Sequence, residues 1–182
     1  MACERTMVLG LTMVWLTAMA VTGQEAAPKP GDVVFESNLD TPEAQQAWSE
    51  APFAEWVEGH EGTTSLKVTV PADQAAGGHM IRMPLDLERY RGCRLALECM
   101  AKAEGVTEPP QTYLGVKFML HYTSEEAGAY WHNQDNVFGT FDWKKLSFTS
   151  PIAGDATGGE LNLGLQECSG TVWFDAIKVT VY

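Results

Sequence analysis

The sequence predicts an all-β protein, built as an antiparallel β-sandwich with one short helix. Most segments beyond residue 31 alternate apolar and polar residues with a period of two, which is typical of half-buried strands. Turns rich in glycine and proline separate these segments at near-regular spacing, which gives about nine or ten short strands. Only one segment carries the signals of a helix. The length of 182 residues fits one domain.

The helix is expected over Thr41 to Trp48. Thr41 is a suitable N-cap, and Pro42 occupies the first helical position, where its missing N–H costs no hydrogen bond. Glu43 adds a negative charge to the first turn, which the helix dipole favours. We therefore expect a single short helix that lies across a sheet.

The strands are predicted from sets of apolar residues at every second position. These sets are Leu66, Val68 and Val70; Cys93, Leu95, Leu97 and Cys99; Leu114, Val116, Phe118, Leu120 and Tyr122; and Leu161, Leu163 and Leu165. Each set is expected to face the core, because successive side chains of a strand point to opposite faces.

The charge of the chain excludes one class of partner. Twelve lysines and arginines against 24 aspartates and glutamates give a formal net charge of -12. Binding to nucleic acid needs a basic face that neutralises phosphates, so nucleic acid is not an expected partner. The same charge disfavours anionic membrane surfaces and polyanionic polysaccharides.

The amino terminus is predicted to be a signal peptide over residues 1–20. Met7 to Val21 form an apolar stretch that is shorter than the roughly 20 residues of a membrane span. Small residues at positions 18 and 20 suit cleavage after Ala20. Residues 21–31 are then a flexible leader. The mature protein is expected to be secreted or periplasmic and not membrane-bound, although an uncleaved anchor is the alternative.

Three cysteines follow the leader, and their pairing is left open. Cys93 and Cys99 cannot pair with each other, because six residues of extended strand span about 20 Å. Either of them could form a disulfide with Cys168 in an exported protein. The alternative is that all three are reduced and buried as small apolar residues.

Four segments together resemble a known family. They are Val33–Glu36, Gly62–Val68, Leu85–Gly92 and Gly170–Asp175. In this order and spacing they resemble a carbohydrate-binding module of the galactose-binding-like jelly-roll type, as in families 4, 9 and 22 of bacterial cellulases and xylanases. The resemblance covers nearly the whole mature chain. It implies a jelly-roll domain over residues 32–182 that binds a polysaccharide or oligosaccharide without catalysis and supports glycan degradation beside a glycoside hydrolase.

The resemblance also implies a structural calcium ion. In the family a glutamate near the first strand and an aspartate in the last strand help to hold this ion, and these residues correspond to Glu36 and Asp175. Backbone carbonyls near Thr63 and Thr64 complete the expected set. Calcium prefers several hard oxygen ligands and accepts carbonyls beside carboxylates, so the set is chemically suitable.

The residues expected to bind a sugar come from separate segments of the sequence. Sugar recognition needs a flat aromatic ring for stacking and fixed polar groups for the hydroxyls. Opposite the apolar face of the Leu114–Tyr122 set lie Tyr113, Lys117 and His121, with Met119 between them. Gln166 lies on the polar face of another predicted strand, and Arg82 could present further donors.

A second rich stretch is Gly128 to Asn136, which combines adjacent aromatic residues with a run of amides. This composition favours a binding loop, in which Trp131 is the expected stacking platform. The alternative is that Trp131 is a packed anchor of the loop.

No catalytic residues are predicted. Glycosidases need two carboxylates about 5–10 Å apart across a cleft, whereas Glu125 and Glu126 are sequence neighbours that point apart in a strand. The sequence is also compatible with two alternatives to a binding domain. One is a structural or adhesion β-sandwich of an extracellular assembly, which would bury Tyr113, His121 and Trp131. The other is a small polysaccharide lyase or hydrolase that uses His121.

Overall fold

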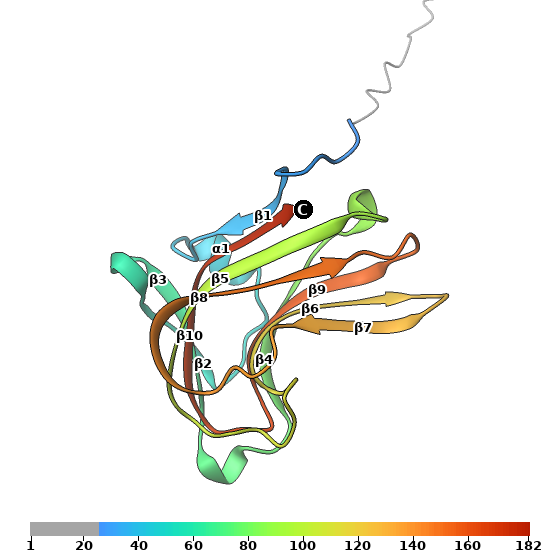
Figure 1. Cartoon of the computed structure of the whole chain (residues 1–182). Helices are drawn as coiled ribbons and strands as arrows, with labels where there is room; N and C mark the ends of the chain where they lie inside the picture. Colours follow the sequence, from blue (N-terminus) through green and yellow to red (C-terminus); the bar gives the residue numbers. More distant parts are fainter. Residues whose placement is uncertain (1–25) are drawn as a thin grey trace, which may run out of the picture.

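The computed structural model describes residues 26–182, so the predicted signal peptide lies outside the described residues. Two antiparallel sheets pack face to face, as the sequence predicts (Figure 1). Residues 26–31 precede the first strand, and the N–H of Gly31 donates to the carbonyl of Val181 at 2.8 Å. Within residues 26–182 no helix is long and apolar enough to cross a membrane.

The larger sheet has six strands. In the order of pairing they are β2 (Ala54–Glu58), β3 (Thr64–Val70), β10 (Gly170–Val181), β5 (Arg94–Val106) and β8 (Gly139–Pro151), and β1 (Val33–Ser37) also pairs with β10. The last strand, β10, is central because it has partners on both edges. Along one edge β3 pairs with its first half and β1 with its second half, and along the other edge β5 pairs with both halves. The first and last strands of residues 26–182 thereby lie side by side in one sheet.

The smaller sheet has four strands. Their order is β4 (Gly78–Pro84), β9 (Thr157–Gln166), β6 (Gly115–Ser124) and β7 (Gly128–Asn133). Neighbouring strands are antiparallel throughout, which agrees with the jelly-roll arrangement that the resemblance implies. The free edges of this sheet are therefore β4 and β7.

The predicted helix is present as α1 (Pro42–Gln46), two residues shorter at its end than expected. The hydroxyl of Thr41 accepts a hydrogen bond from the N–H of Ala44 at 3.2 Å, which is the expected N-cap. Three single-turn 3-10 segments also occur, namely η1 (His60–Gly62), η2 (Ala72–Gln74) and η3 (Glu88–Tyr90).

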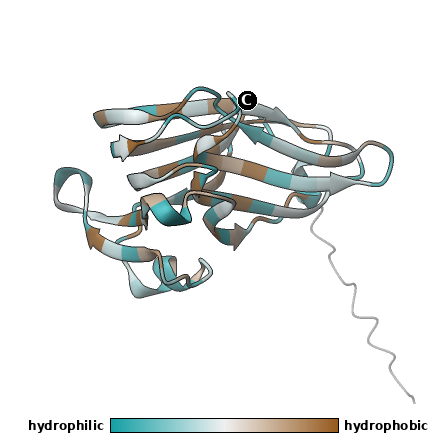
Figure 2. Ribbon diagram, turned by 90° about the horizontal axis from the view of Figure 1, so that it is seen from below, coloured by the Kyte–Doolittle hydropathy of each residue, from teal (hydrophilic) through white to brown (hydrophobic). Residues whose placement is uncertain are grey.

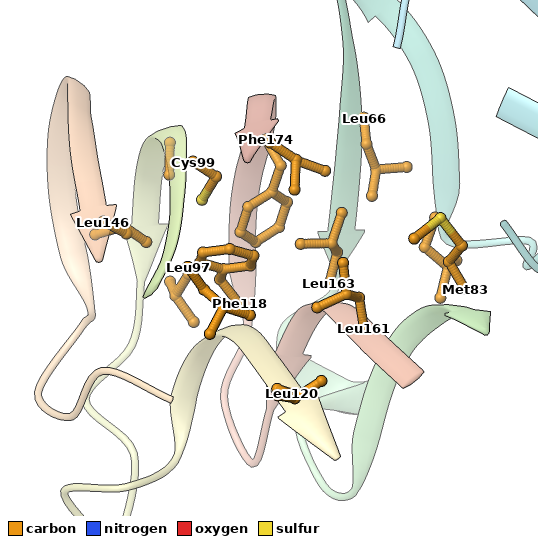
Figure 3. Close-up of a cluster of buried hydrophobic side chains, with 14 of the residues drawn as sticks. Leu66, Met83, Leu97, Cys99, Phe118, Leu120, Leu146, Leu161, Leu163 and Phe174 are labelled. Atoms are coloured by element: carbon orange, nitrogen blue, oxygen red, sulfur yellow. The ribbon is translucent and has the colours of Figure 1, made fainter. Parts of the chain in front are cut away.

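The core lies between the two sheets and is formed by the predicted alternating sets. In Figure 3, Leu97 and Phe174 of the larger sheet point toward Phe118 and Leu163 of the smaller one. All four side chains are buried. Figure 2 shows the matching alternation of hydrophobic and hydrophilic residues along the strands. Burial of such apolar surface is the main favourable contribution to folding.

The three cysteines downstream of the leader are free, so the reduced alternative is the one that the structure shows. Cys99 and Cys168 are buried, and burial raises the pKa of both thiols. Cys93 precedes β5 and is only half-buried. The buried thiols therefore act as small apolar side chains and are poor nucleophiles.

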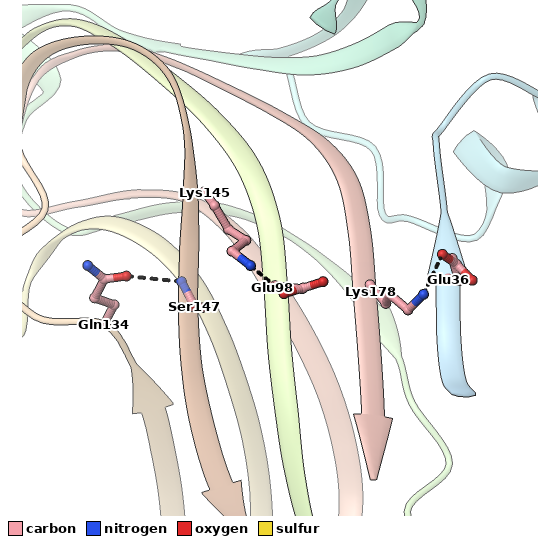
Figure 4. A network of polar contacts seen from close by, with 6 residues as sticks. All are labelled: Glu36, Glu98, Gln134, Lys145, Ser147 and Lys178. Carbon is pink, nitrogen blue, oxygen red and sulfur yellow. Dashed lines mark hydrogen bonds and ion pairs between the residues drawn. The ribbon is translucent and has the colours of Figure 1, made fainter. Parts of the chain in front are cut away.

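The outer face of the larger sheet carries cross-strand ion pairs. Lys145 pairs with Glu98 at 3.1 Å, and Lys178 pairs with Glu36 at 3.0 Å (Figure 4). These side chains are well exposed, so each pair contributes only about 0–1 kcal/mol to stability. This face is a solvated surface in which charges match across strands.

His132 gives the fold an acid sensitivity. Its ring stacks beside Tyr130 at a centroid distance of 5.6 Å, and burial lowers its pKa below 6.5. The unfolded chain thus binds more protons than the folded chain between the lowered pKa and 6.5. We expect the free energy of unfolding to fall as the pH is lowered through this window, and to fall less in His132→Phe. Urea denaturation at several pH values gives the free energy of unfolding as a function of pH. If this pH dependence is the same in His132→Phe as in the wild type, another group causes it.

Candidate functional site

The outer face of the smaller sheet collects most of the predicted ligand-binding residues. Because the alternating apolar residues of β4, β9 and β6 face the core, their neighbours face outward. The outer face comprises Met80 and Arg82 on β4; Glu160, Asn162, Gly164 and Gln166 on β9; Lys117, Met119 and His121 on β6; and Trp131 and Asn133 on β7. Strand order thus unites residues that are far apart in the sequence.

Trp131 is the most exposed aromatic residue of this face, with 57% of its surface accessible. It pairs across the strands with His121, and the two rings stack at a centroid distance of 3.5 Å and an angle of 12°. One face of the indole is therefore covered by the imidazole, which fixes its orientation. The accessible surface of Trp131 lies on the edge strand β7.

His121 keeps one nitrogen available. Its Nδ1 lies 2.8 Å from the carbonyl oxygen of Tyr130. Because a carbonyl can only accept, Nδ1 carries the proton, and Nε2 of the neutral ring is an acceptor. His121 is half-buried, so this nitrogen can meet a ligand hydroxyl.

The prediction that Gly128 to Asn136 form a loop is wrong for its first six residues, which are the edge strand β7. Tyr130 and His132 pack toward the core beside Tyr122, while Trp131 faces outward. The alternation was present in the sequence, but the run of amides concealed it. Pairing with β6 makes Trp131 part of a rigid sheet.

Lys117 departs from the prediction. Only 2% of its surface is exposed, so it does not offer a surface contact to a ligand. Its ammonium donates to the backbone carbonyl of Tyr113 and to Oδ1 of Asn133 at 3.3 Å. Burial lowers the pKa of Lys117, and the charge of Asp135 partly opposes this. The physical role of Lys117 is to hold the segment before β6 against the sheet.

Tyr113 is exposed, in agreement with the prediction, and 56% of its surface is accessible. The side-chain amide of Asn133 donates to its carbonyl oxygen at 3.3 Å, so Tyr113 adjoins the outer face at the end opposite His121 and Trp131. The face thus carries one exposed aromatic ring near each end.

Arg82 and Gln166 lie on the outer face as predicted, Arg82 exposed and Gln166 half-buried. Arg82 lies opposite Asn162, a buried residue whose Oδ1 has no hydrogen-bond partner in the structure. Glu160, opposite His121, adds a half-buried carboxylate to the face that was not predicted from the sequence. Its alternation with Asn162 on β9 is the signal that could have identified it.

A separate cluster of oxygen atoms lies on the larger sheet around Asp175, which is 1% exposed. Its Oδ2 accepts hydrogen bonds from the N–H of His60 at 3.0 Å and from the hydroxyl of Thr63 at 2.6 Å. The same hydroxyl also lies against the carbonyl oxygen of His60. The hydroxyl of Thr63 has one proton, so it can donate to only one of these two oxygens. Its other contact brings two oxygen atoms together without a hydrogen bond.

Ser65 belongs to the same cluster. It is fully buried, and its hydroxyl has no hydrogen-bond partner. A Cβ atom at Gly59 would lie 2.5 Å from Cβ of Ser65 and 2.7 Å from Oδ2 of Asp175. Only glycine therefore allows the loop before β3 to close over both side chains. An unpartnered buried hydroxyl beside converging oxygens is suited to a hard cation.

The other predicted calcium ligands are placed differently. The carboxylate of Glu36 pairs with Lys178, and the N–H of Thr64 donates to Oδ1 of Asp40 at 2.7 Å. Within residues 26–182 no group of three His, Cys, Asp or Glu side chains could hold a metal ion. A cation at Asp175 would therefore depend on hydroxyl and carbonyl oxygens.

The adjacent acids Glu125 and Glu126 lie in the turn between β6 and β7. Asp155 accepts hydrogen bonds from the hydroxyl of Ser124 at 3.0 Å and from the N–H of Glu126 at 3.1 Å. These bonds lower the pKa of Asp155. The acids of this region thus belong to a capped turn.

No protein-family model and no curated protein matches the sequence. Among solved structures, the family 22 carbohydrate-binding module and catalytic module of Clostridium thermocellum endo-1,4-β-D-xylanase 10B, complexed with xylohexaose, match with a TM-score of 0.60 and 14% identity. That match covers 83% of this chain and 29% of the other.

Two structures from Paenibacillus barcinonensis Xyn10C also match at 14% identity. The tandem of family 22 modules has a TM-score of 0.62, with 86% of this chain and 46% of that chain covered. The single xylan-binding domain has a TM-score of 0.61, with 85% of this chain and 97% of that domain covered. This chain thus spans less than half of the two longer structures and nearly all of the single domain. The chain therefore has the jelly-roll fold of the family 22 carbohydrate-binding modules.

Proposed function

We propose that this protein binds a polysaccharide or oligosaccharide, without catalysis, on the outer face of the smaller sheet. The observation that carries the proposal is Trp131, an exposed indole whose orientation is fixed by His121. A flat aromatic surface stacks on the apolar face of a pyranose ring. Because the ring is already ordered, binding costs little side-chain entropy.

The polar groups around this ring suit sugar hydroxyls. Nε2 of His121 is an acceptor, Glu160 is a further acceptor, and the exposed guanidinium of Arg82 is a donor. The net charge of -12 disfavours anionic glycans, so neutral xylans and glucans are the first candidates. The xylan-binding domain with the same fold supports xylan as the first ligand to test.

The exposure of Trp131 and Tyr113 favours binding over a purely structural or adhesive sandwich, which would bury these rings. A lyase would need a proton donor beside the base His121, whereas Tyr122 is buried, donates its hydroxyl to the carbonyl of Pro151 and stacks on Tyr130. The proposed role is to keep a glycan near a partner glycoside hydrolase outside the cytoplasm, after removal of residues 1–20. The matched xylanase, in which a module of this fold accompanies a catalytic module, supports this partner.

Trp131→Ala should weaken binding to xylohexaose or soluble xylan by about 1–3 kcal/mol, which is roughly 5- to 150-fold in affinity. The loss follows from removal of the stacking surface. Affinity electrophoresis and isothermal titration calorimetry measure it. Tyr182→Ala is the control, because Tyr182 is an exposed aromatic residue at the end of the larger sheet and should not matter. Unchanged affinity in folded Trp131→Ala would place the glycan elsewhere.

We further propose that a calcium ion binds at Asp175 and has a structural role. The oxygens that would hold it are Oδ2 of Asp175, the hydroxyls of Thr63 and Ser65, and the carbonyl of His60. Two observations support this set. The carbonyl oxygen of His60 and Oδ2 of Asp175 both lie against the hydroxyl of Thr63, and the buried hydroxyl of Ser65 has no hydrogen-bond partner. When bound, calcium would link the loop before β3 to the central strand β10. Glu36 could join only by leaving Lys178.

A further inference from the structure

A pocket of about 520 Å³ lies outside the sheet face described above. It opens between the segment of α1 and the edge strands β2 and β4 of the two sheets. Its lining includes Trp48, Trp56, Gln46, Ser49, Glu50 and Ala51. A cavity of this size falls in the range of small-ligand sites, which is about 300–1,000 Å³.

The chemistry of the pocket is aromatic inside and polar at its rim. Trp48 is 4% exposed, and its Nε1 is buried without a hydrogen-bond partner. Trp56 is half-buried beside it, while Gln46 and Glu50 are exposed. A buried indole N–H normally donates to an acceptor, so the lack of an acceptor for Nε1 of Trp48 requires an explanation. Two indoles together with amide and carboxylate groups are the combination that a sugar ring needs.

The pocket is joined to the proposed sugar-binding face. The N–H of Ser49 donates to the carbonyl of Arg82 at 2.8 Å, and the N–H of Arg82 donates to the hydroxyl of Ser49 at 3.0 Å. The rim of the pocket is thus fixed to the edge strand that presents Arg82 to the outer face. Trp131 lies on β7, the opposite edge of the same sheet.

The spacing of the strands sets the size of the ligand. From β7 to β4 there are three intervals between strands, which amount to about 14 Å. A single pyranose ring is too small to cover this width. A glycan that crosses the strands from Trp131 to Arg82 would arrive at Ser49 and continue toward the pocket.

We propose that this pocket is an extension subsite that accommodates a sugar unit of the same oligosaccharide that binds on the outer face. The sugar ring would pack on Trp56, and its hydroxyls would meet Gln46 and Glu50. This inference rests on the proposed function, because it extends that binding face beyond the edge of β4.

The test uses the length dependence of binding with xylobiose, xylotriose and xylohexaose. Ala51→Phe should fill the pocket, since Ala51 is a half-buried residue of its wall. We expect its affinity for xylohexaose to fall about tenfold, while the affinity for xylobiose stays within about twofold of wild type. Affinity for xylohexaose that matches wild type would overturn the subsite. Loss of xylobiose binding in Ala51→Phe but not in Trp131→Ala would show a separate site and overturn the shared ligand.

A second variant protects the test against misfolding of Ala51→Phe. Gln46→Ala with Glu50→Gln removes the amide of one rim residue and the carboxylate of another, and should lower xylohexaose affinity in the same length-dependent way. Glu43→Gln is the matched control, because Glu43 is an exposed carboxylate of α1 outside the pocket. If the wild-type chain binds none of the three oligosaccharides, nor the corresponding cello-oligosaccharides, the proposed function itself fails. Binding with equal length dependence in all variants rejects only the subsite.

Discussion

Asp175→Ala should lower the free energy of unfolding by about 3 kcal/mol or more. The carboxylate accepts hydrogen bonds from the N–H groups of His60 and Ala176 and from the hydroxyl of Thr63. Its removal takes the acceptor from two backbone N–H groups, while the hydroxyl of Thr63 can still donate to the carbonyl of His60. Each unsatisfied buried group costs about 1–3 kcal/mol. Urea denaturation in the presence of a chelator measures this effect without any contribution from calcium.

The same variant tests the calcium proposal. Calcium that binds only the folded wild-type chain should stabilise it by about 2.7 kcal/mol when its concentration is about 100 times the dissociation constant. Asp175→Ala should not respond to calcium. Asp73→Ala is the control, since Asp73 is an exposed carboxylate, and it should change stability by less than about 0.5 kcal/mol. Equal calcium stabilisation of Asp175→Ala would place the ion elsewhere, and no response of the wild type would reject the ion.

Gly164→Ala should destabilise the fold by more than about 3 kcal/mol, through a clash in the smaller sheet. The added Cβ would lie 2.0 Å from the carbonyl oxygen of His79 and 2.8 Å from Cα of Met80. These are backbone atoms of the paired strand β4, so no side-chain rotation can relieve the contact. The φ angle of +152° at this position adds strain for any residue with a side chain.

Gly154→Ala is the matched control for this effect. A Cβ atom at Gly154 would meet nothing within 4 Å, and its φ lies outside the left-handed region. Urea denaturation of both variants should therefore show a large loss for Gly164→Ala and a small change for Gly154→Ala. If Gly164→Ala lost as little stability as Gly154→Ala, β4 and β9 would be able to move apart at this point with little loss of free energy. A folded Gly164→Ala that loses xylan binding would indicate that this close approach also shapes the outer face.

Several features of the fold could be predicted because they depend on local sequence. The alternation of Val116, Phe118 and Leu120 identified a strand and its inner face, and all three are buried. The N-cap at Thr41 marked the start of the helix, since capping involves residues three positions apart. The family resemblance supplied the jelly roll, which the sheet topology and the solved structures confirm.

The candidate site was predicted only in part. Trp131 and Tyr113 are exposed as expected, but alternation could not show that the outward-facing Lys117 is covered. Its burial depends on Tyr113 and Asn133, which approach it through the packing of neighbouring segments. The extent of β7 was missed for a related reason, because an edge strand that is half exposed has a weak apolar pattern.

The sequence by itself determined the class of fold, the inner faces of its strands, the start of its helix and its net acidity. These properties follow from residue type and from the period of two in an extended backbone. Only the tertiary structure decided which side chains meet. The stack of His121 on Trp131, the approach of Thr63 and Ser65 to Asp175, and the pocket beside Ser49 all depend on strand order and register. Strand order arises from pairing between distant segments, and the alternation within one strand does not determine which strand becomes its neighbour.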